Sequence, residues 1–192
     1  MNEFPLYSAD EFRRRALHQS GSPVELAWRD HGDHRLNPET ISQVAGLKLK
    51  DAAVLIPVVD SGDDAKVIFT LRTSTLRKHS GQIAFPGGAI DPEDASPEMA
   101  AVREAGEEIG LADIFIEPVA RLPHYLAATG FRITPILAVV KPGFHLALNP
   151  TEVEDAFEVP LSFLMDPDHH VTDTMLWQGT ERHFYRMPYG QR

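Results

Sequence analysis

The chain has 192 residues, of which 43% are hydrophobic, and a formal net charge of -10 at pH 7. This length suits one domain with an adequate core, and the negative charge argues against sequence-independent binding of DNA or RNA, which needs Lys and Arg to neutralise phosphates. Because the sequence has no cysteine, it excludes disulfides, thiolate nucleophiles and zinc–thiolate sites, so any metal must bind to oxygen or imidazole.

The sequence shows no feature that would take the protein into a membrane or out of the cell. No apolar run approaches the roughly 18 residues needed to span a bilayer. The N-terminus lacks the basic and then apolar plan of a secretory signal peptide. We therefore expect a cytoplasmic protein without membrane or nucleic-acid partners, whose oligomeric state the sequence does not indicate.

Residues 1–50 are predicted to be a lead-in to the core of the fold. Residues Ala9–Gln19 predict a short amphipathic helix with a basic run at Arg13, Arg14 and Arg15. Residues 21–50 are polar, contain histidines and have only weak periodicity, so we expect a loop-rich segment there.

Three β-strands are predicted with clear signals. Residues Ala52–Val59 and Lys66–Leu71 are apolar and β-branched, and Asp60–Asp64 forms the turn between them, which predicts a hairpin. Residues Phe131–Val140 are the third strand, in which Pro135 favours a bulge or an edge position.

A helix is predicted over Pro97–Ile109. Ser96 is a preferred N-cap residue, proline suits the first helical position, and Gly110 is placed to end the helix. At roughly 100° per residue, one arc of this helix is apolar or small. That arc comprises Met99, Ala101, Val102, Ala105, Gly106 and Ile109.

The opposite arc of the same helix is acidic and carries Glu104, Glu107 and Glu108, with Arg103 at its edge. Like charges three or four residues apart destabilise a helix by roughly 0.2–0.5 kcal/mol per pair, and the last turn disfavours anions. An ion pair with Arg103 and bound Mg²⁺ or Mn²⁺, which prefer oxygen ligands, would offset both penalties. A solvated surface face is the other interpretation, and the spacing alone does not decide between the two.

The sequence around this helix resembles the signature of the Nudix hydrolases. That signature reads Gly, five residues, Glu, seven residues, Arg-Glu, an apolar residue, any residue, Glu-Glu, any residue, Gly and an apolar residue. The second half, Arg103–Leu111, matches in full if Ala105 counts as apolar. In the first half, the position five residues beyond Gly88 is Asp94 rather than Glu, and eight residues rather than seven separate it from Arg103.

Other segments narrow the resemblance to the coenzyme A diphosphatase subfamily. Leu71–Gly88 is similar to the element that precedes the signature in that subfamily, whose members also tend to show the shortened acid and the one-residue expansion. Ala128–Pro135 and Glu152–Leu161 are similar as well, so the resemblance spans roughly Ala52 to Leu164.

The resemblance implies a fold that periodicity alone does not give, since the order of elements by itself indicates only a mixture of α and β. The implied fold is α/β (α+β), with a mixed β-sheet sandwiched between α-helices. We expect a single Nudix hydrolase domain over residues 1–192, with its core at 51–165 and the signature at 87–111.

The resemblance also implies roles for residues of the signature. Glu104, Glu107 and Glu108 would bind the divalent metal and help to activate water, with most weight on Glu108 and Glu104. Arg103 would orient a glutamate, and Gly88 would join the metal shell through its carbonyl group.

Residues outside the acidic helix complete the predicted site. Glu152 resembles a downstream acid that completes the metal or base set in several family members, and a plain surface acid is an equally open interpretation. Gly87 and Gly88 are expected to contact the substrate. A compact basic cluster near the site in sequence is assigned to the phosphates of coenzyme A, with ordinary solvated charge as the alternative. That cluster comprises Arg72, Arg77, Lys78 and His79. His79 could equally form a hydrogen bond with the backbone, so it stays outside the catalytic set.

These inferences predict metal-dependent hydrolysis of the diphosphate bond of coenzyme A or its derivatives, giving 4′-phosphopantetheine and adenosine 3′,5′-bisphosphate, with Mg²⁺ or Mn²⁺ as cofactor. One alternative is a Nudix hydrolase of ADP-ribose, nucleotide sugars or another nucleoside diphosphate derivative, because loops read the substrate. A second is a non-catalytic, nucleotide-sensing Nudix module, which the complete set of acidic residues and Arg103 disfavours. A calcium loop beginning at Asp91 is discarded, because Ser96 and Val102 stand where glycine and glutamate belong.

Overall fold

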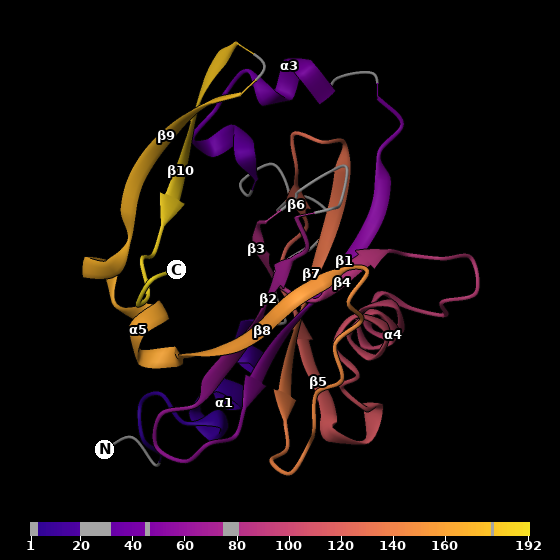
Figure 1. Cartoon of the computed structure of the whole chain (residues 1–192), viewed down its shortest axis with the longest axis vertical. Helices are drawn as coiled ribbons and strands as arrows, with labels where there is room; N and C mark the ends of the chain where they lie inside the picture. The colour runs from indigo at the N-terminus through magenta and orange to yellow at the C-terminus, as the bar shows by residue number, and fades with distance from the viewer. Residues whose placement is uncertain (1–3, 20–31, 45–46, 75–80, 178) are drawn as a thin grey trace.

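A mixed β-sheet with helices on both faces forms the centre of the computed structural model (Figure 1), which describes residues 4–19, 32–44, 47–74, 81–177 and 179–192. The strands of this sheet are β1 (Lys50–Val59), β2 (Lys66–Arg72), β3 (Ile83–Ala84), β4 (Gly87–Ala89), β5 (Ile116–Arg121), β6 (Tyr125–Leu126), β7 (Phe131–Val140) and β8 (Val153–Pro160). The helices are α1 (Ala9–Gln19), α3 (Thr40–Val44), α4 (Pro97–Ile109) and α5 (Leu161–Met165), with 3₁₀ turns at Asp33–Arg35, Asp113–Phe115 and Pro167–His169. The predicted mixed sheet between helices is confirmed.

The sheet has a parallel pair at its centre and antiparallel pairs around it. Strands β1 and β7 run parallel, from Lys50 opposite Phe131 to Val59 opposite Val140. The strand order is β3-β2-β1-β7-β5, and β4, β6 and β8 pair with β1, β7 and β2 respectively. Strand β4, made of Gly87–Ala89, therefore lies directly beside β1 and brings the glycine pair to the sheet.

Alternation along β7 sends side chains into two separate cores, because successive residues of a strand point to opposite faces. Ile136, Ala138 and Val140 pack in one cluster with the buried alanines of α4. Val139 packs in the other cluster with Ala9 of α1. The two helices thus cover opposite faces of the sheet, and α4 lies on the face that carries the candidate site.

The predicted hairpin and the third predicted strand are confirmed. Strands β1 and β2 pair antiparallel, with Val58 opposite Val67 and Val59 opposite Lys66. Strand β7 has the bounds predicted from the sequence.

The sequence predicts Pro135 at a bulge or at an edge. The edge position is wrong, because β7 has neighbours on both sides, and β7 pairs with β1 through Pro135 in unbroken register, without a bulge. The Pro135 carbonyl accepts a hydrogen bond from Leu122 N–H at 3.0 Å, just beyond the end of β5, and β6 begins only at Tyr125. The N–H and C=O groups of one strand residue point to the same side. The side of Pro135 that lacks an N–H therefore faces the gap between β5 and β6, where no hydrogen bond of the sheet is lost.

Helix α1 has its predicted bounds, and its basic run is bound to acidic side chains. Arg14 and Arg15 donate hydrogen bonds of 2.7 Å to Glu11, whose side chain is 1% exposed. Arg13 donates to Glu117 of β5 at 3.0 and 3.1 Å. The run therefore fixes α1 to itself and to the sheet.

We expect the stability of the fold to depend on the ionisation of Glu11. Hydrogen bonds from Arg14 and then Arg15 lower the pKa of Glu11 from 4.5 to about 2. Because the folded-state pKa is depressed, the stabilisation is complete above pH 4.5 and is lost as the pH falls through about 2. Glu11→Gln should lower the unfolding temperature at neutral pH, and its difference from the unmodified chain should shrink between pH 4.5 and 2. Asp10→Asn, at an exposed ion pair of the same helix, serves as the control with little effect; a Glu11→Gln difference that stays constant with pH would contradict the expectation.

The lead-in and the C-terminal part of the chain meet away from α4. Strands β9 (Val171–Trp177) and β10 (Thr180–Arg186) form a separate two-stranded sheet beside α3 (Figure 1). The Asn37 side chain binds the backbone of His183 in both directions, at 2.8 and 2.9 Å. In the parts of the chain that the structure describes, no helix is both long and apolar enough to cross a bilayer.

Candidate active site at the acidic helix

Helix α4 begins and ends where its local signals predict. The Ser96 side chain accepts a hydrogen bond from the N–H of Met99 at 3.3 Å. Gly110 has a φ of 67°, and its N–H donates to the Gly106 carbonyl at 3.0 Å. A residue with a side chain would be strained in this left-handed conformation, so the end of the helix depends on glycine.

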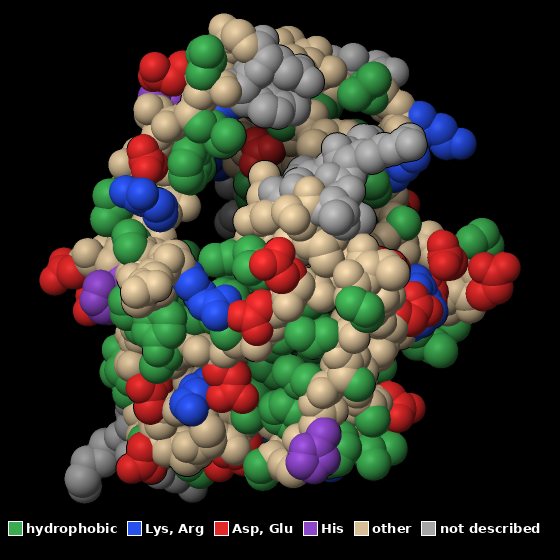
Figure 2. Space-filling model, in the orientation of Figure 1, with side chains coloured by type: hydrophobic (Ala, Val, Ile, Leu, Met, Phe, Trp, Pro, Cys, Tyr) green, Lys and Arg blue, Asp and Glu red, His purple; other side chains and the backbone are tan. Residues whose placement is uncertain are grey.

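The buried face of α4 differs from the predicted apolar arc. Met99, placed on that arc, is 55% exposed, whereas Ala100 is fully buried. Glu108, placed on the opposite acidic arc, is only 2% exposed. The buried face of α4 is therefore rotated toward Ala100 and Glu108 relative to the prediction. Figure 2 shows that acidic side chains still gather on the surface over α4 and the loop before it.

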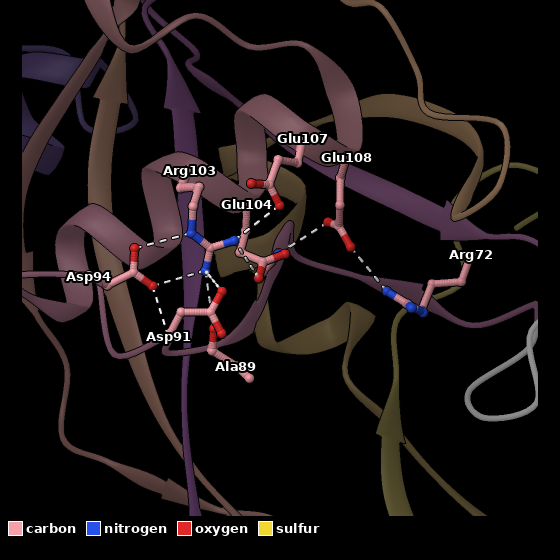
Figure 3. A network of polar contacts seen from close by, with 9 residues as sticks. Arg72, Ala89, Asp91, Asp94, Arg103, Glu104, Glu107 and Glu108 are labelled. Atoms are coloured by element: carbon pink, nitrogen blue, oxygen red, sulfur yellow. Dashed lines mark hydrogen bonds and ion pairs between the residues drawn. The ribbon is translucent and has the colours of Figure 1, made fainter.

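The Glu108 carboxylate is held at both oxygen atoms (Figure 3). Its Oε2 accepts a hydrogen bond from the Gly87 N–H, and its Oε1 accepts one from Arg72 Nη1, each at 3.1 Å. Burial raises the pKa of Glu108 to about 7; the Gly87 N–H and Arg72 oppose this rise, and the charges of Glu104 and Glu152 add to it. The carboxylate is thus both fixed in place and crowded by negative charge.

Gly88 provides the space in which the Glu104 carboxylate lies. A Cβ atom at position 88 would stand 2.4 Å from Glu104 Oε1 and 2.7 Å from Oε2. Burial raises the pKa of Glu104, and Arg103 opposes the rise. Strand β4 therefore needs glycine at position 88, because a carboxylate packs directly against its backbone.

Gly87 is required for a different reason. A Cβ atom there would stand 2.4 Å from the Ala53 carbonyl oxygen and 2.7 Å from the Val54 Cα, both backbone atoms of β1. Only glycine permits this close approach of β4 to β1. The approach places the Gly87 N–H within reach of Glu108.

Arg103 is the centre of the acidic network in Figure 3. It donates to Asp94 through Nε at 3.1 Å and Nη2 at 2.9 Å, and to Glu104 and Glu107 through Nη1 at 3.1 and 3.0 Å. Its Nη2 also reaches the Ala89 carbonyl at 3.2 Å. The hydrogen bonds that Asp94 accepts, first from Arg103 and then from the Asp91 N–H, lower the pKa of Asp94. Asp94 thus fixes one side of the guanidinium, so that its other side is directed at the glutamates.

Asp94 was not among the residues predicted for the site. The signal was present, since Asp94 stands at the acidic position where the signature is shortened and shifted by one residue. A shorter side chain at that position still binds Arg103 through both oxygen atoms.

Glu152 approaches the site from the segment before β8. Its carbonyl accepts from Thr73 N–H at 3.0 Å, just past β2, and Asn149 N–H donates to the Glu108 carbonyl at 2.9 Å. Its charge raises the pKa of both Glu104 and Glu108. The fold therefore places Glu152 near enough for its charge to act on Glu104 and Glu108, while Glu107 is exposed and paired with Arg103.

The donor set suits a hard divalent cation, although its arginine contacts must change for one to bind. Carboxylate and backbone carbonyl oxygens are the ligands that Mg²⁺ and Mn²⁺ prefer. Among the described residues, no three acidic or imidazole side chains already converge as a metal site. Arg103 pairs with Glu104 and Glu107, and Arg72 pairs with Glu108. The space at Gly88 keeps the Glu104 oxygen atoms against the turn, and the crowded negative charge favours a cation.

The predicted phosphate-binding cluster divides into two parts. Arg72 binds Glu108 rather than extending into solvent. Arg77 and Lys78, with His79, lie outside the described residues. Nothing in the sequence signalled the pairing of Arg72 with Glu108, because the two residues are 36 positions apart.

Two curated bacterial proteins are similar to this chain in sequence. A protein of Citrobacter koseri, named an uncharacterized Nudix hydrolase NudL, is 41% identical over 128 residues, which are 67% of this chain and 63% of that protein. A protein of the same name from an Enterobacter species is 37% identical over 147 residues, which are 72% of this chain and 76% of that protein. The chain thus spans less than two thirds of the Citrobacter relative.

A similar solved structure is a Nudix hydrolase from M. smegmatis, RenU, with 26% sequence identity and a TM-score of 0.48. The similarity covers 58% of this chain and 70% of that one. The model of the NUDIX domain family matches residues 49–178, which include the sheet, the glycine turn and all of α4. Since this match covers more than half of the sequence, the chain belongs to the Nudix family.

Proposed function

We propose that the protein hydrolyses the diphosphate bond of coenzyme A or its derivatives in a metal-dependent reaction, giving 4′-phosphopantetheine and adenosine 3′,5′-bisphosphate. Membership of the Nudix family supports the coarser activity, a hydrolase acting on nucleoside diphosphate derivatives. The observation that carries the proposal is the buried Glu108 carboxylate, which the Gly87 N–H holds at the glycine pair and which the charges of Glu104 and Glu152 crowd. The similarity of Leu71–Gly88 to the coenzyme A subfamily supports the choice of substrate.

The proposed reaction is the attack of water on one phosphorus atom of the diphosphate. A new P–O bond forms from the water oxygen, the bond from that phosphorus to the bridging oxygen breaks, and the bridging oxygen leaves with the other phosphate. The water proton passes to a nearby base and then to solvent. A divalent cation, held by Glu104, Glu108 and the Gly88 carbonyl, would neutralise the non-bridging oxygens and lower the pKa of the attacking water.

The protein's own contribution is to fix the ligands before the substrate arrives. The Gly87 N–H holds the Glu108 carboxylate at Oε2, and Gly88 leaves the space in which the Glu104 carboxylate lies. Groups held in place need little reorganisation during the reaction, which favours the transition state. Glu152, from another segment, is the candidate for a further ligand or the base.

A substrate panel tests the proposal directly. The purified chain would be incubated with coenzyme A, ADP-ribose and NADH, each with Mg²⁺ and with Mn²⁺, and the products identified by mass spectrometry. Highest kcat/KM with coenzyme A, together with the two products named above, supports the proposal. Preference for ADP-ribose would assign a different nucleoside diphosphate substrate, and nucleotide binding without hydrolysis would assign a sensing module.

We also expect Arg77 to read the 3′-phosphate of coenzyme A, because it belongs to the basic cluster of the element that precedes the glycine turn. Arg77→Ala should raise KM for coenzyme A about tenfold, since a charge-assisted contact to phosphate is lost. The KM for 3′-dephospho-coenzyme A should change much less. Steady-state kinetics with both compounds measures the difference, and equal effects would mean that Arg77 contacts a group common to them.

A further inference from the structure

Arg72 points from the end of β2 toward Glu108 of α4 (Figure 3). Its Nη1 lies 3.1 Å from Glu108 Oε1, and the arginine side chain is 23% exposed while that of Glu108 is 2% exposed. Among the residues that the structure describes, the Arg72 side chain makes one hydrogen bond, the one to Glu108. A guanidinium carries five N–H donors, so donors remain for a ligand that approaches from the exposed side.

The backbone of Arg72 is fixed, so a change of partner would involve its side chain alone. Its N–H donates to the Gln82 carbonyl at 3.0 Å, and its own carbonyl accepts from Gly81 N–H at 3.1 Å. The next N–H, that of Thr73, donates to the Glu152 carbonyl at 3.0 Å. The end of β2 thus holds the Arg72 backbone beside the segment that carries Glu152.

The Glu108 carboxylate cannot serve Arg72 and a divalent cation equally well. Its Oε2 accepts from the Gly87 N–H and its Oε1 from Arg72, so a cation that binds Oε1 competes with the guanidinium. A cation at Oε1 would stand next to the guanidinium, and like charges at that separation repel strongly in a half-buried site. The nearby charges of Glu104 and Glu152 favour the cation with the higher charge.

We propose that Arg72 is an exchangeable counter-ion, which pairs with Glu108 in the metal-free site and moves to a non-bridging oxygen of the substrate diphosphate when a divalent cation binds Glu108. This inference rests on the proposed function, because it requires a cation and a diphosphate at the same site. It makes Arg72 a positioning residue for Glu108 in one state and a diphosphate ligand in the other. It also sets an order, in which cation binding makes Arg72 available for the diphosphate.

The test measures Mn²⁺ binding to the full chain by electron paramagnetic resonance, without nucleotide, for the unmodified protein, Arg72→Gln and Arg72→Lys. Arg72→Gln removes the competing charge and should bind Mn²⁺ about tenfold more tightly. The Mn²⁺-saturated Arg72→Gln variant should bind the non-hydrolysable diphosphate α,β-methylene-ADP about tenfold more weakly. Arg72→Lys, which keeps the charge, should lie between the two in both measurements.

Lys66→Gln is the matched control, because it removes the same charge from the other end of β2, where Lys66 pairs with Glu158 at 3.4 Å. Lys66→Gln should change neither the Mn²⁺ affinity nor the α,β-methylene-ADP affinity.

If Arg72→Gln folds less stably, the rise of its unfolding temperature with Mn²⁺ reports binding to the folded chain and should exceed that of the unmodified protein. Mn²⁺ affinity that is unchanged or weaker in Arg72→Gln would overturn the exchange and leave the proposed function intact. If the unmodified chain binds no Mn²⁺, both the exchange and the proposed function are wrong.

Discussion

Replacing Glu108 with glutamine should reduce kcat by about three orders of magnitude, because a neutral amide binds a divalent cation poorly and the cation supplies several kcal/mol of transition-state stabilisation. The fold should remain, since the amide oxygen can still accept the hydrogen bond that Arg72 or Gly87 now donates to the carboxylate. Steady-state hydrolysis with Mg²⁺, together with circular dichroism and thermal unfolding, measures the two effects separately.

Glu98→Gln is the control for this variant, because it makes the same chemical change in the first turn of the same helix. Glu98 pairs with Arg121 of β5 and not with Arg72 or Gly87, the partners of Glu108. It should therefore keep the hydrolysis rate of the unmodified chain while losing an ion pair. Glu108→Gln with near-normal turnover would remove Glu108 from the mechanism.

The two adjacent glycines should respond to alanine in different ways. Gly88→Ala places a Cβ against the Glu104 carboxylate, the movable end of a side chain. Glu104 can move aside at small cost in stability, but its oxygen atoms then leave the site. Because a displacement of about 1 Å in a reacting site can cost about 100-fold in rate, we expect kcat to fall by about that factor while the unfolding temperature stays within a few degrees.

Gly87→Ala should instead destabilise the whole fold. Its Cβ would meet backbone atoms of Ala53 and Val54 in β1, which cannot move without breaking the sheet. Overpacking of this kind costs on the order of 3 kcal/mol, so thermal unfolding should begin at a clearly lower temperature. If Gly88→Ala were the less stable of the two, or if it retained full activity, the assigned packing of Glu104 against the turn would be incorrect.

Elements with strong local signals could be predicted from the sequence. Helix α4 has its predicted bounds, because Ser96 and Gly110 act on the backbone within one helical turn. The β1–β2 hairpin and β7 were likewise evident from runs of β-branched residues.

Elements whose pairing depends on distant partners were not predicted. Strand β4 consists of two glycines and an alanine, and it is a strand only because β1 pairs with it. Strands β9 and β10 pair with each other outside the main sheet, and polar residues interrupt the patterns of both. The position of Pro135 required knowledge of where β5 ends and β6 begins, which no pattern around the proline contains.

By itself, the sequence determined which chemical groups are present and where the helix that carries them begins and ends: carboxylates on one helix, a glycine turn before it and no thiolate. Only the tertiary structure decided that Glu108 is buried, that Gly87 and Arg72 hold it, and that Asp94 holds Arg103. The reason is physical, since capping and propensity act over a few residues, whereas Glu108 meets partners 21 and 36 positions away that only the packing of β2, β4 and α4 brings together.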